Sequence, residues 1–161
     1  EIGSGLVGSE MCIRDRSYFK AIIEAGIDFD VVGIQLYFPG RDLVAVDLLL
    51  NAFAALGKPI HITEMGVNGG FRQKGNAGSS WSQMAMSEGT WHGGWNEHTQ
   101  ADWLEQFYTI AASRKEIQAL TWWDFIEPSF SGNGAMLYEN ENPRESYFRL
   151  LALKNRIVRK A

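Results

Sequence analysis

Residues 57–67 read GKPIHITEMGV, and their centre is the short apolar run PIHITEM from Pro59 to Met65. A run of this length is too short for a typical helix, and Gly57 and Pro59 separate it from the segment before it, so it predicts a β-strand. Glu64 stands near the end of this strand. Burying a carboxylate there costs free energy unless the group is paired or used in chemistry, so Glu64 is either a structural residue bonded to a neighbour or a functional one.

Two similar runs flank this one along the chain. Residues 29–37, FDVVGIQLY, and residues 117–125, IQALTWWDF, are also predicted strands. Helices are predicted between and around them: one over residues 17–25, one from Asp42 to Gly57, one over residues 96–114 and one from Asn142 onward. Strands that alternate with helices favour a parallel α/β architecture, in which buried strands are nearly continuous in apolar residues.

The predicted helix ends carry recognisable signals. Gly26 and Gly57 stand where a residue in the left-handed conformation closes a helix. Asn142, Pro143 and Glu145 predict the N-cap, the first position and the capping-box residue of the last helix.

Polar side chains collect at the carboxyl ends of the three predicted strands. They are Gln35 and Tyr37 on the first strand, Thr63 and Glu64 on the second, and Trp123, Asp124 and Glu127 on or after the third. The active site of a β/α barrel lies at this face, so the sequence concentrates its possible chemistry at one rim. Strand alternation predicts that Asp124 points away from Trp123, and that His61 points away from Glu64, toward a helix.

These motifs resemble those of the family-10 glycoside hydrolases, the β-1,4-xylanases. GKPIHITEMGV is similar to the family's seventh strand, GIQLYF (33–38) to its sixth and ALTWWDFIEPSF (119–130) to its eighth, and AMLYENENPRESYFRLLALKN (135–155) resembles its closing segment. The resemblance implies the C-terminal portion of a (β/α)8 TIM barrel, strands six to eight with their helices. A whole barrel takes roughly 250 residues, so we expect the N-terminal half of the barrel to be missing from this chain.

The resemblance also assigns roles to residues at the rim. It implies a retaining glycosidase in which Glu64 is the nucleophile and Trp123 is the aromatic floor of a sugar subsite, with Gln35 and Tyr37 beside them. The family usually has His where Tyr37 stands, so this chain looks like a divergent member. Retention needs a second carboxyl group about 5 to 5.5 Å from the nucleophile. The resemblance places that acid/base on the fourth strand, so we expect the chain alone to be inactive.

Two further residues are candidate contacts to the sugar. Glu127 stands where the family has an Asp, and it is either a substrate contact or an ordinary loop acid. Trp91 lies in the glycine-rich stretch 66–95, which also holds Trp81 and Trp95. Exposed aromatic rings stack on sugars. The alternative is that Trp91 and Trp95 pin this stretch to the helix that follows, in which case they are buried.

Composition excludes other classes of function. The net charge of −4 over 161 residues disfavours nucleic-acid binding, and no apolar run is long enough to cross a membrane. The single Cys and the three His have no spacing typical of a metal site, and phosphate-binding and serine-hydrolase motifs are absent, so we expect no metal and no cofactor.

The expected partner is therefore a polysaccharide. Two alternatives stay open: another retaining glycosidase that acts on cellulose or mannan, and a non-catalytic glycan-binding protein. A polymeric substrate implies a secreted or periplasmic enzyme, although the chain shows no signal peptide. A partial barrel would expose the apolar edge of its first strand and the inner face of all three strands, so we expect poor solubility or association.

Residues 1–16 look foreign to the rest of the chain. They show neither helical nor strand periodicity, and the run MCIRD at residues 11–15 resembles a translated transposon-end sequencing adapter of the kind found at the edges of metagenomic reading frames. We therefore expect no regular element here and treat residues 17–161 as the partial barrel. The alternative is an ordinary flexible N-terminal arm.

Overall fold

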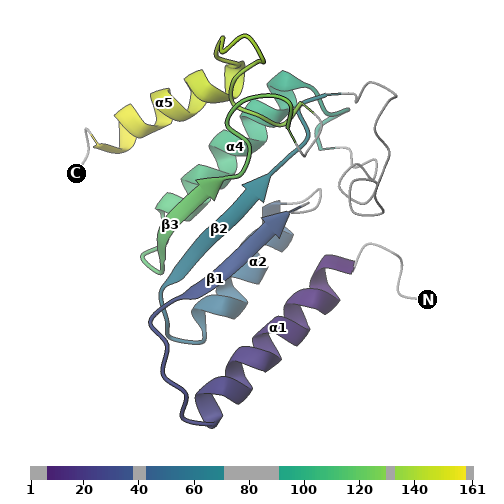
Figure 1. Cartoon of the computed structure of the whole chain (residues 1–161). Coiled ribbons are helices and arrows are strands. Elements are labelled where there is room, and N and C mark those ends of the chain that lie inside the picture. The colour runs from purple at the N-terminus through teal and green to yellow at the C-terminus, as the bar shows by residue number, and fades with distance from the viewer. Residues whose placement is uncertain (1–6, 38–42, 71–90, 130–132, 159–161) are drawn as a thin grey trace.

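The computed structural model describes residues 7–37, 43–70, 91–129 and 133–158. Three parallel strands form one sheet in the order β1 (Val32–Tyr37), β2 (Ile60–Gly66), β3 (Ile117–Trp122). The helices of the described residues are α1 (Val7–Glu24), α2 (Leu43–Ala54), α4 (Glu97–Ala112) and α5 (Glu145–Val158) (Figure 1). The predicted parallel α/β architecture is confirmed; β1 and β3 are shorter than the apolar runs that predicted them, and β2 has the predicted length, shifted by one residue.

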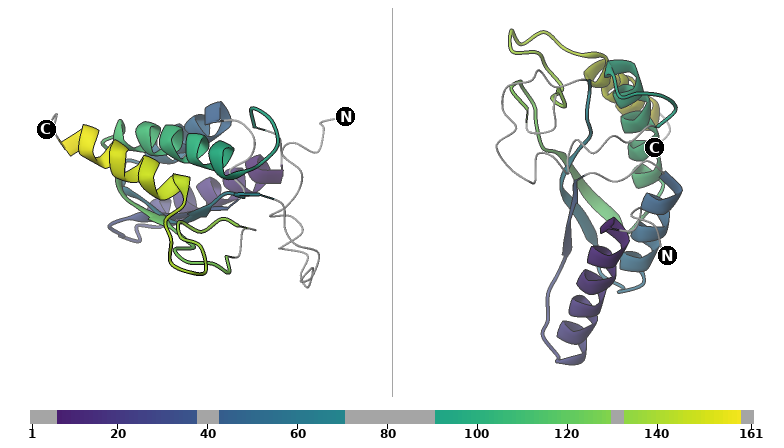
Figure 2. Two further views of the ribbon diagram at one scale, coloured as in Figure 1. Left: turned by 90° about the horizontal axis from the view of Figure 1, so that it is seen from above. Right: turned by 90° about the vertical axis from the view of Figure 1, so that its right-hand side faces the viewer.

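The helices lie on one side of the sheet. α2 and α4 cover one face, α5 packs on α4 and α1 lies beside α2, whereas no helix of the described chain covers the other face (Figure 2). The covered face forms the core, which is made of Val32, Ile34, Leu36, Ile60, Ile62 and Met65 from the strands and Leu43, Val46, Leu50, Phe53, Trp103 and Phe107 from the helices. Among the described residues, none of the helices is long and apolar enough to cross a membrane.

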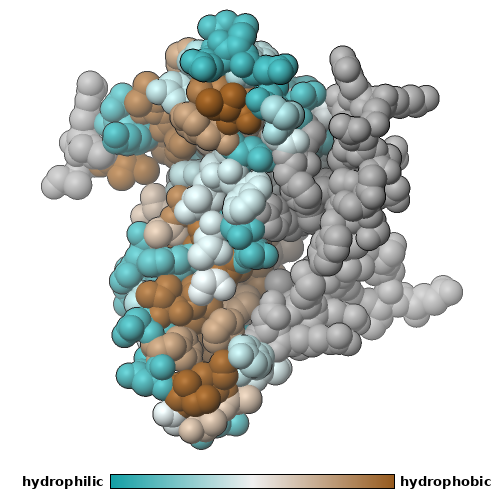
Figure 3. All heavy atoms as spheres, viewed as in Figure 1, coloured by the Kyte–Doolittle hydropathy of each residue, from teal (hydrophilic) through white to brown (hydrophobic). Residues whose placement is uncertain are grey.

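The uncovered face of the sheet, called the open face below, is small and polar. On β1, Gly33 and Gln35 are exposed there, because they alternate with buried apolar residues. Among the described strand residues, this face includes Gly33, Gln35, His61, Thr63, Glu64, Ala119 and Thr121. Seen from this side, hydrophilic and intermediate residues run down the middle of the molecule (Figure 3).

An irregularity in β2 changes which residues share a face. Ile34 pairs with Ile62, but the next residue, Gln35, pairs with Glu64, so Thr63 is an extra residue in the ladder. The extra residue shifts the alternation by one position. The prediction that His61 and Glu64 point to opposite faces is therefore wrong, and His61 does not point toward a helix.

Gly33 makes room for this irregularity. A Cβ at residue 33 would lie 3.3 Å from the Cγ2 methyl of Thr63, a tight contact. The Thr63 hydroxyl donates to the Ile34 carbonyl at 3.2 Å. Thr63 thus lies across β1, and the small residue opposite lets it do so.

Glycines close the first two helices as predicted. Gly26 has φ 71°, with hydrogen bonds from the Ile27 N–H to the Ile22 carbonyl (3.2 Å) and from the Gly26 N–H to the Ile23 carbonyl (3.0 Å). These two hydrogen bonds satisfy carbonyl groups at the end of α1 that have no partner within the helix. Gly57, with φ 73°, follows α2 in the same conformation.

The prediction that Asn142 caps the last helix is wrong, because α5 begins at Glu145. The Asn142 carbonyl accepts a hydrogen bond from the Tyr138 N–H at 2.9 Å, and the Arg144 N–H donates to the Met136 carbonyl at 3.0 Å. These bonds fold the segment before α5 back on itself, so its backbone groups are already committed outside a helix.

The prediction of no regular element in residues 1–16 is wrong for residues 7–16, which form the first half of α1. Once one helical turn exists, each added residue costs little free energy. The stretch contains no proline and includes good helix formers such as Glu10, Met11 and Arg14. The helix that begins the partial barrel therefore continues toward the N-terminus.

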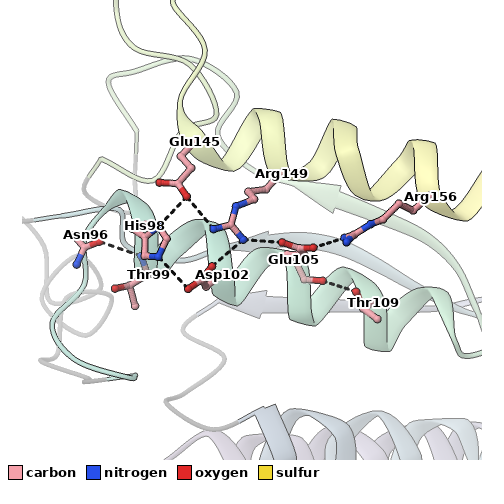
Figure 4. Close-up of polar contacts among 9 residues, drawn as sticks. All are labelled: Asn96, His98, Thr99, Asp102, Glu105, Thr109, Glu145, Arg149 and Arg156. Carbon is pink, nitrogen blue, oxygen red and sulfur yellow. Dashed lines mark hydrogen bonds and ion pairs between the residues drawn. The ribbon is translucent and has the colours of Figure 1, made fainter.

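Ion pairs join α4 to α5 (Figure 4). Arg149 on α5 lies 2.8 Å from Glu105 and 2.9 Å from Asp102, both on α4, and 3.0 Å from Glu145 on its own helix. Arg156 also pairs with Glu105. The hydrogen bond from Arg149, followed by that from Arg156, holds the pKa of Glu105 below its ordinary value. The ionised carboxylate of Glu105 is therefore part of what holds α5 in place.

The start of α4 joins the same network. Asn96, where the predicted helix begins, is the N-cap of α4, and its side-chain oxygen accepts from the Thr99 N–H at 3.0 Å. Two residues later, the two ring nitrogens of His98 lie 2.8 Å from Glu145 and 3.5 Å from Asp102 (Figure 4).

Candidate active site

Glu64 lies at the carboxyl end of β2, beside Gln35 of β1. The two residues are partners in the ladder, and Gln35 Nε2 donates a hydrogen bond to Glu64 Oε1 at 3.0 Å. Gln35 is exposed and Glu64 is half-buried, so the pair is accessible from the open face. The structure brings the two predicted site residues together, and their roles in catalysis stay predictions.

Trp123 follows β3 directly and lies at the same rim. Its backbone N–H donates to the Met65 carbonyl at 2.8 Å, and this hydrogen bond continues the ladder one residue beyond β3. Met65 is the neighbour of Glu64, and alternation places the side chains of Trp123 and Glu64 on the open face. Trp123 is 50% exposed, so its indole offers a surface on which a sugar could stack.

Tyr37 is the register partner of Gly66, one position beyond Met65. Its backbone therefore reaches the same rim, while its side chain lies outside what the structure describes. Trp81, predicted as one of three candidate stacking residues, also lies outside the described residues.

Glu127 is committed to structural contacts. Its Oε2 accepts from the Ser129 N–H at 2.6 Å, and its Oε1 accepts from the Ala135 N–H at 3.1 Å and lies 3.2 Å from Nη2 of Arg144. Its side chain is only 12% exposed. Neither expectation for Glu127, a sugar contact or an ordinary exposed loop acid, fits a carboxylate whose two oxygens are occupied within the protein.

Arg144 binds several groups in and around the segment between β3 and α5, and it was not among the residues predicted from the sequence. Besides Glu127, it reaches Glu97 with Nη1 at 3.0 Å and the Asn133 carbonyl at 3.1 Å, and its guanidinium lies 4.4 Å from the centre of the Tyr138 ring. A hydrogen bond between the Tyr138 side chain and Glu97 raises the pKa of Tyr138 above its ordinary value. The group holds the segment between β3 and α5 against the start of α4.

Trp91 is buried. It is 5% exposed, its ring stacks on His92 with 4.0 Å between centroids, and Trp95 lies parallel to it at 6.5 Å. A ring this buried presents almost no surface to a sugar. The alternative interpretation, in which Trp91 and Trp95 pin the stretch before α4 to that helix, fits the structure better.

Gln100 is the second residue that sequence reasoning missed. It is fully buried on α4, and its Nε2 donates to the carbonyls of Val67 and Gly134, each at 3.0 Å. A signal was present in the sequence, because Gln100 lies four residues before Leu104 on the apolar stripe of the helix. A polar side chain on a buried face needs partners, and here these come from the loops after β2 and β3.

Metal ligands do not gather in the described part of the chain. Among those residues, no group of three or more His, Cys, Asp or Glu side chains could hold a metal ion.

Comparison with known proteins places the chain in a family. Residues 14–152 match the family model described as Glycosyl hydrolase family 10. No curated protein sequence matches the chain significantly.

Several solved structures are similar to the chain. Xylanase 10B from Thermotoga maritima is 22% identical with a TM-score of 0.65, and the match covers 89% of this chain and 42% of that one. Xylanase 10B from Thermotoga petrophila RKU-1, solved with xylobiose, is 22% identical with a TM-score of 0.64, over 88% of this chain and 41% of that one. A GH10 xylanase from Thermobacillus composti is 18% identical with a TM-score of 0.63, over 92% and 50%.

This likeness establishes the fold. The three strands and their helices form part of a (β/α)8 barrel, as predicted. The chain spans 42% of the length of the Thermotoga maritima xylanase.

Proposed function

The chain belongs to glycosyl hydrolase family 10, and we propose that it is the C-terminal part of a retaining glycoside hydrolase that cleaves β-1,4-linked xylan or a related plant polysaccharide. The observation that carries the proposal is the placement of Glu64. Its carboxylate stands at the rim, accepts a hydrogen bond from Gln35 and has the half-exposed Trp123 on the next strand. Active sites of β/α barrels lie at this rim. The xylobiose complex of the Thermotoga petrophila relative supports a xylose-based substrate.

In the proposed mechanism Glu64 is the nucleophile. One of its oxygens forms a bond to the anomeric carbon while the bond from that carbon to the glycosidic oxygen breaks, and an acid donates a proton to the departing oxygen. Water then attacks the glycosyl ester, returns the carboxylate of Glu64 and gives its proton to the same acid/base. The Gln35 amide orients the carboxylate through its hydrogen bond to Oε1.

The acid/base belongs to strands that this chain does not contain. Glu127, the nearest alternative in the sequence, is occupied by Arg144 and two backbone N–H groups. We propose that residues 17–161 are completed by preceding β/α units, that residues 1–16 are derived from an adapter, and that the chain alone does not hydrolyse its substrate. Sequencing the native gene upstream of codon 17 tests this. A continuous frame with a Glu at an earlier strand end supports it, and a start codon just before Ser17 contradicts it.

A polymeric substrate cannot enter a cell, so the proposal includes a secreted or periplasmic location. Fractionation of the source organism, with the protein detected by antibody, tests this part separately.

Binding of xylohexaose to the chain tests the site directly. The variant Trp123→Ala removes the exposed ring and is expected to weaken the affinity about tenfold, because a stacked aromatic contributes on the order of 1 kcal/mol. Trp91→Phe is the matched control, since it alters a tryptophan ring that is buried. Equal affinity of Trp123→Ala and the wild type would contradict the assignment of Trp123.

The identity of the sugar and the chemistry are tested by two further comparisons. Cellohexaose or mannohexaose binding more tightly than xylohexaose would favour a cellulase or a mannanase. In the completed protein, Glu64→Gln is expected to abolish hydrolysis and keep binding. A completed wild-type protein that binds but does not hydrolyse would favour a glycan-binding protein.

A further inference from the structure

One buried side chain joins the two loops that carry the site residues. Val67 follows the end of β2, three residues after Glu64, and Gly134 belongs to the segment that returns from the loop after Trp123. Nε2 of Gln100 donates to both carbonyls, each at 3.0 Å. Gln100 is 0% exposed and comes from a third element, α4.

The chemistry of the amide fixes how Gln100 lies. Both of its partners are carbonyl oxygens, which accept hydrogen bonds, so the NH2 group and not Oε1 has to face them. Oε1 is buried and has no hydrogen-bond partner within the described chain. Such an orphaned buried atom costs free energy, which the two hydrogen bonds of Nε2 have to offset. The side chain is therefore placed by its link to the two loops.

The two loops also touch each other beside Gln100. A Cβ at Gly69, in the loop after β2, would lie 2.0 Å from the carbonyl oxygen of Asn133. That carbonyl accepts from Arg144, and the next one, of Gly134, accepts from Trp122 Nε1 as well as from Gln100. The segment 133–135 is thus held on several sides, and Gln100 supplies the side-chain link from it to the loop after β2.

We infer that Gln100 is a positioning residue that holds the loop after β2 against the returning segment of the loop after β3, and so fixes Glu64 relative to Trp123. The inference rests on the proposed function for its consequence, which is the affinity for the sugar. The link between the loops is a physical property of the chain and is measurable without any sugar.

The test uses the full chain and the variant Gln100→Met. Methionine has a similar length and suits a helix, but it cannot donate to the two carbonyls. Leu104→Val is the control, because it alters the next buried turn of α4 and removes no hydrogen bond to either loop. Hydrogen exchange is measured at the Gly134 and Ala135 amides, which donate to Ser129 and Glu127, and at Ile62 in the core.

We expect Gln100→Met to speed exchange at Gly134 and Ala135 about tenfold and to leave Ile62 within about twofold, because only local hydrogen bonds are lost. Xylohexaose affinity is expected to fall about tenfold in the same variant. Leu104→Val is expected to speed exchange without this local pattern and to keep the affinity. If the amides of Gly134 and Ala135 exchange as slowly in Gln100→Met as in the wild type, the inference is overturned.

The outcomes separate the link from the function. Faster local exchange in a chain that binds no sugar supports the link and counts against the proposed function. Sugar binding with unchanged exchange and affinity in Gln100→Met supports the function and overturns the link. If Gln100→Met does not fold, the side-chain amide protons of Gln100 in the wild type decide: slow exchange supports the link, and exchange as fast as that of exposed Gln106 overturns it.

Discussion

Gln35 and Glu64 are joined by a 3.0 Å hydrogen bond at the point where β1 and β2 lose their regular register. The extra residue, Thr63, brings the carboxylate round to the open face and directly opposite the amide. A regular strand would have sent residue 64 to the helix side, because successive side chains alternate. The irregularity in β2 is therefore what makes the candidate nucleophile accessible.

The first prediction concerns this pair. The side-chain amide protons of Gln35 are expected to exchange more slowly with solvent than those of an exposed glutamine, because the amide donates to the Glu64 carboxylate. Glu64→Ala removes the acceptor and is expected to speed this exchange. Two-dimensional NMR of the side-chain amides measures it, with the exposed Gln106 as the internal reference and Glu139→Gln as the control variant. Equal exchange of the Gln35 amide in Glu64→Ala and in the wild type would show that the bond is not formed in solution.

The second prediction concerns the buried charges under the loop after β3. Arg144→Met is expected to lower the free energy of unfolding by about 3 kcal/mol, because it leaves the carboxylate of Glu127 buried without its cation. Glu127→Gln is expected to cost less, and the double variant less than the sum of the two. Urea denaturation measures these values.

The control for that prediction is Arg156→Met, which removes a more exposed pair with Glu105 and is expected to cost less than about 1 kcal/mol. Equal costs for Arg144→Met and Arg156→Met would contradict a structural role for the Glu127–Arg144 pair.

The third prediction concerns acid. The pKa of Glu105 is lowered by the hydrogen bonds from Arg149 and Arg156. A carboxyl group whose pKa is lower in the folded state stabilises the fold above its unfolded pKa, and this contribution is lost as the pH falls through the folded pKa. Stability is therefore expected to fall below about pH 4.3, the ordinary value of Glu.

Thermal unfolding between pH 7 and pH 3 measures the effect. Glu105→Gln is expected to be less stable than the wild type at pH 7 and to lose less stability on acidification. Glu139→Gln, at an exposed position, is the control and should follow the wild type. Parallel curves for Glu105→Gln and the wild type would contradict the assignment.

The fourth prediction concerns the contact between the two rim loops. Gly69→Ala is expected to lower the free energy of unfolding by about 2 kcal/mol, because the new methyl group would meet the Asn133 carbonyl at 2.0 Å. Gly94→Ala is the matched control, since a Cβ there meets nothing within 4 Å. Denaturation of both variants is the measurement, and a neutral Gly69→Ala would mean that the loops are not in contact.

The open face also bears on association. We expected the apolar edge of the first strand and the exposed inner face of the three strands to cause poor solubility or association, and that face carries residues such as Gln35, His61 and Thr121. Large exposed apolar side chains stand elsewhere, for example Tyr18 on α1 and Phe148 on α5. Association of the chain stays a prediction, and these helices rather than the open face are where it is expected.

Local sequence was enough for the order of the elements and for the position of Glu64. Helical spacing, the glycines after α1 and α2 and the Asn96 cap act within a few residues, so they can be read from the chain directly. Placing Gln35, Glu64 and Trp123 at one rim needed only the rule that parallel strands end at the same edge.

Only the tertiary structure decided which candidate side chains are accessible to a sugar. Glu127 and Trp91 are residue types expected in a sugar site, but Glu127 pairs with Arg144 and Trp91 is buried in the core. The face on which His61 lies depends on one extra residue in the ladder. Contacts between residues far apart in sequence fix all three outcomes, and local periodicity carries no information about such contacts.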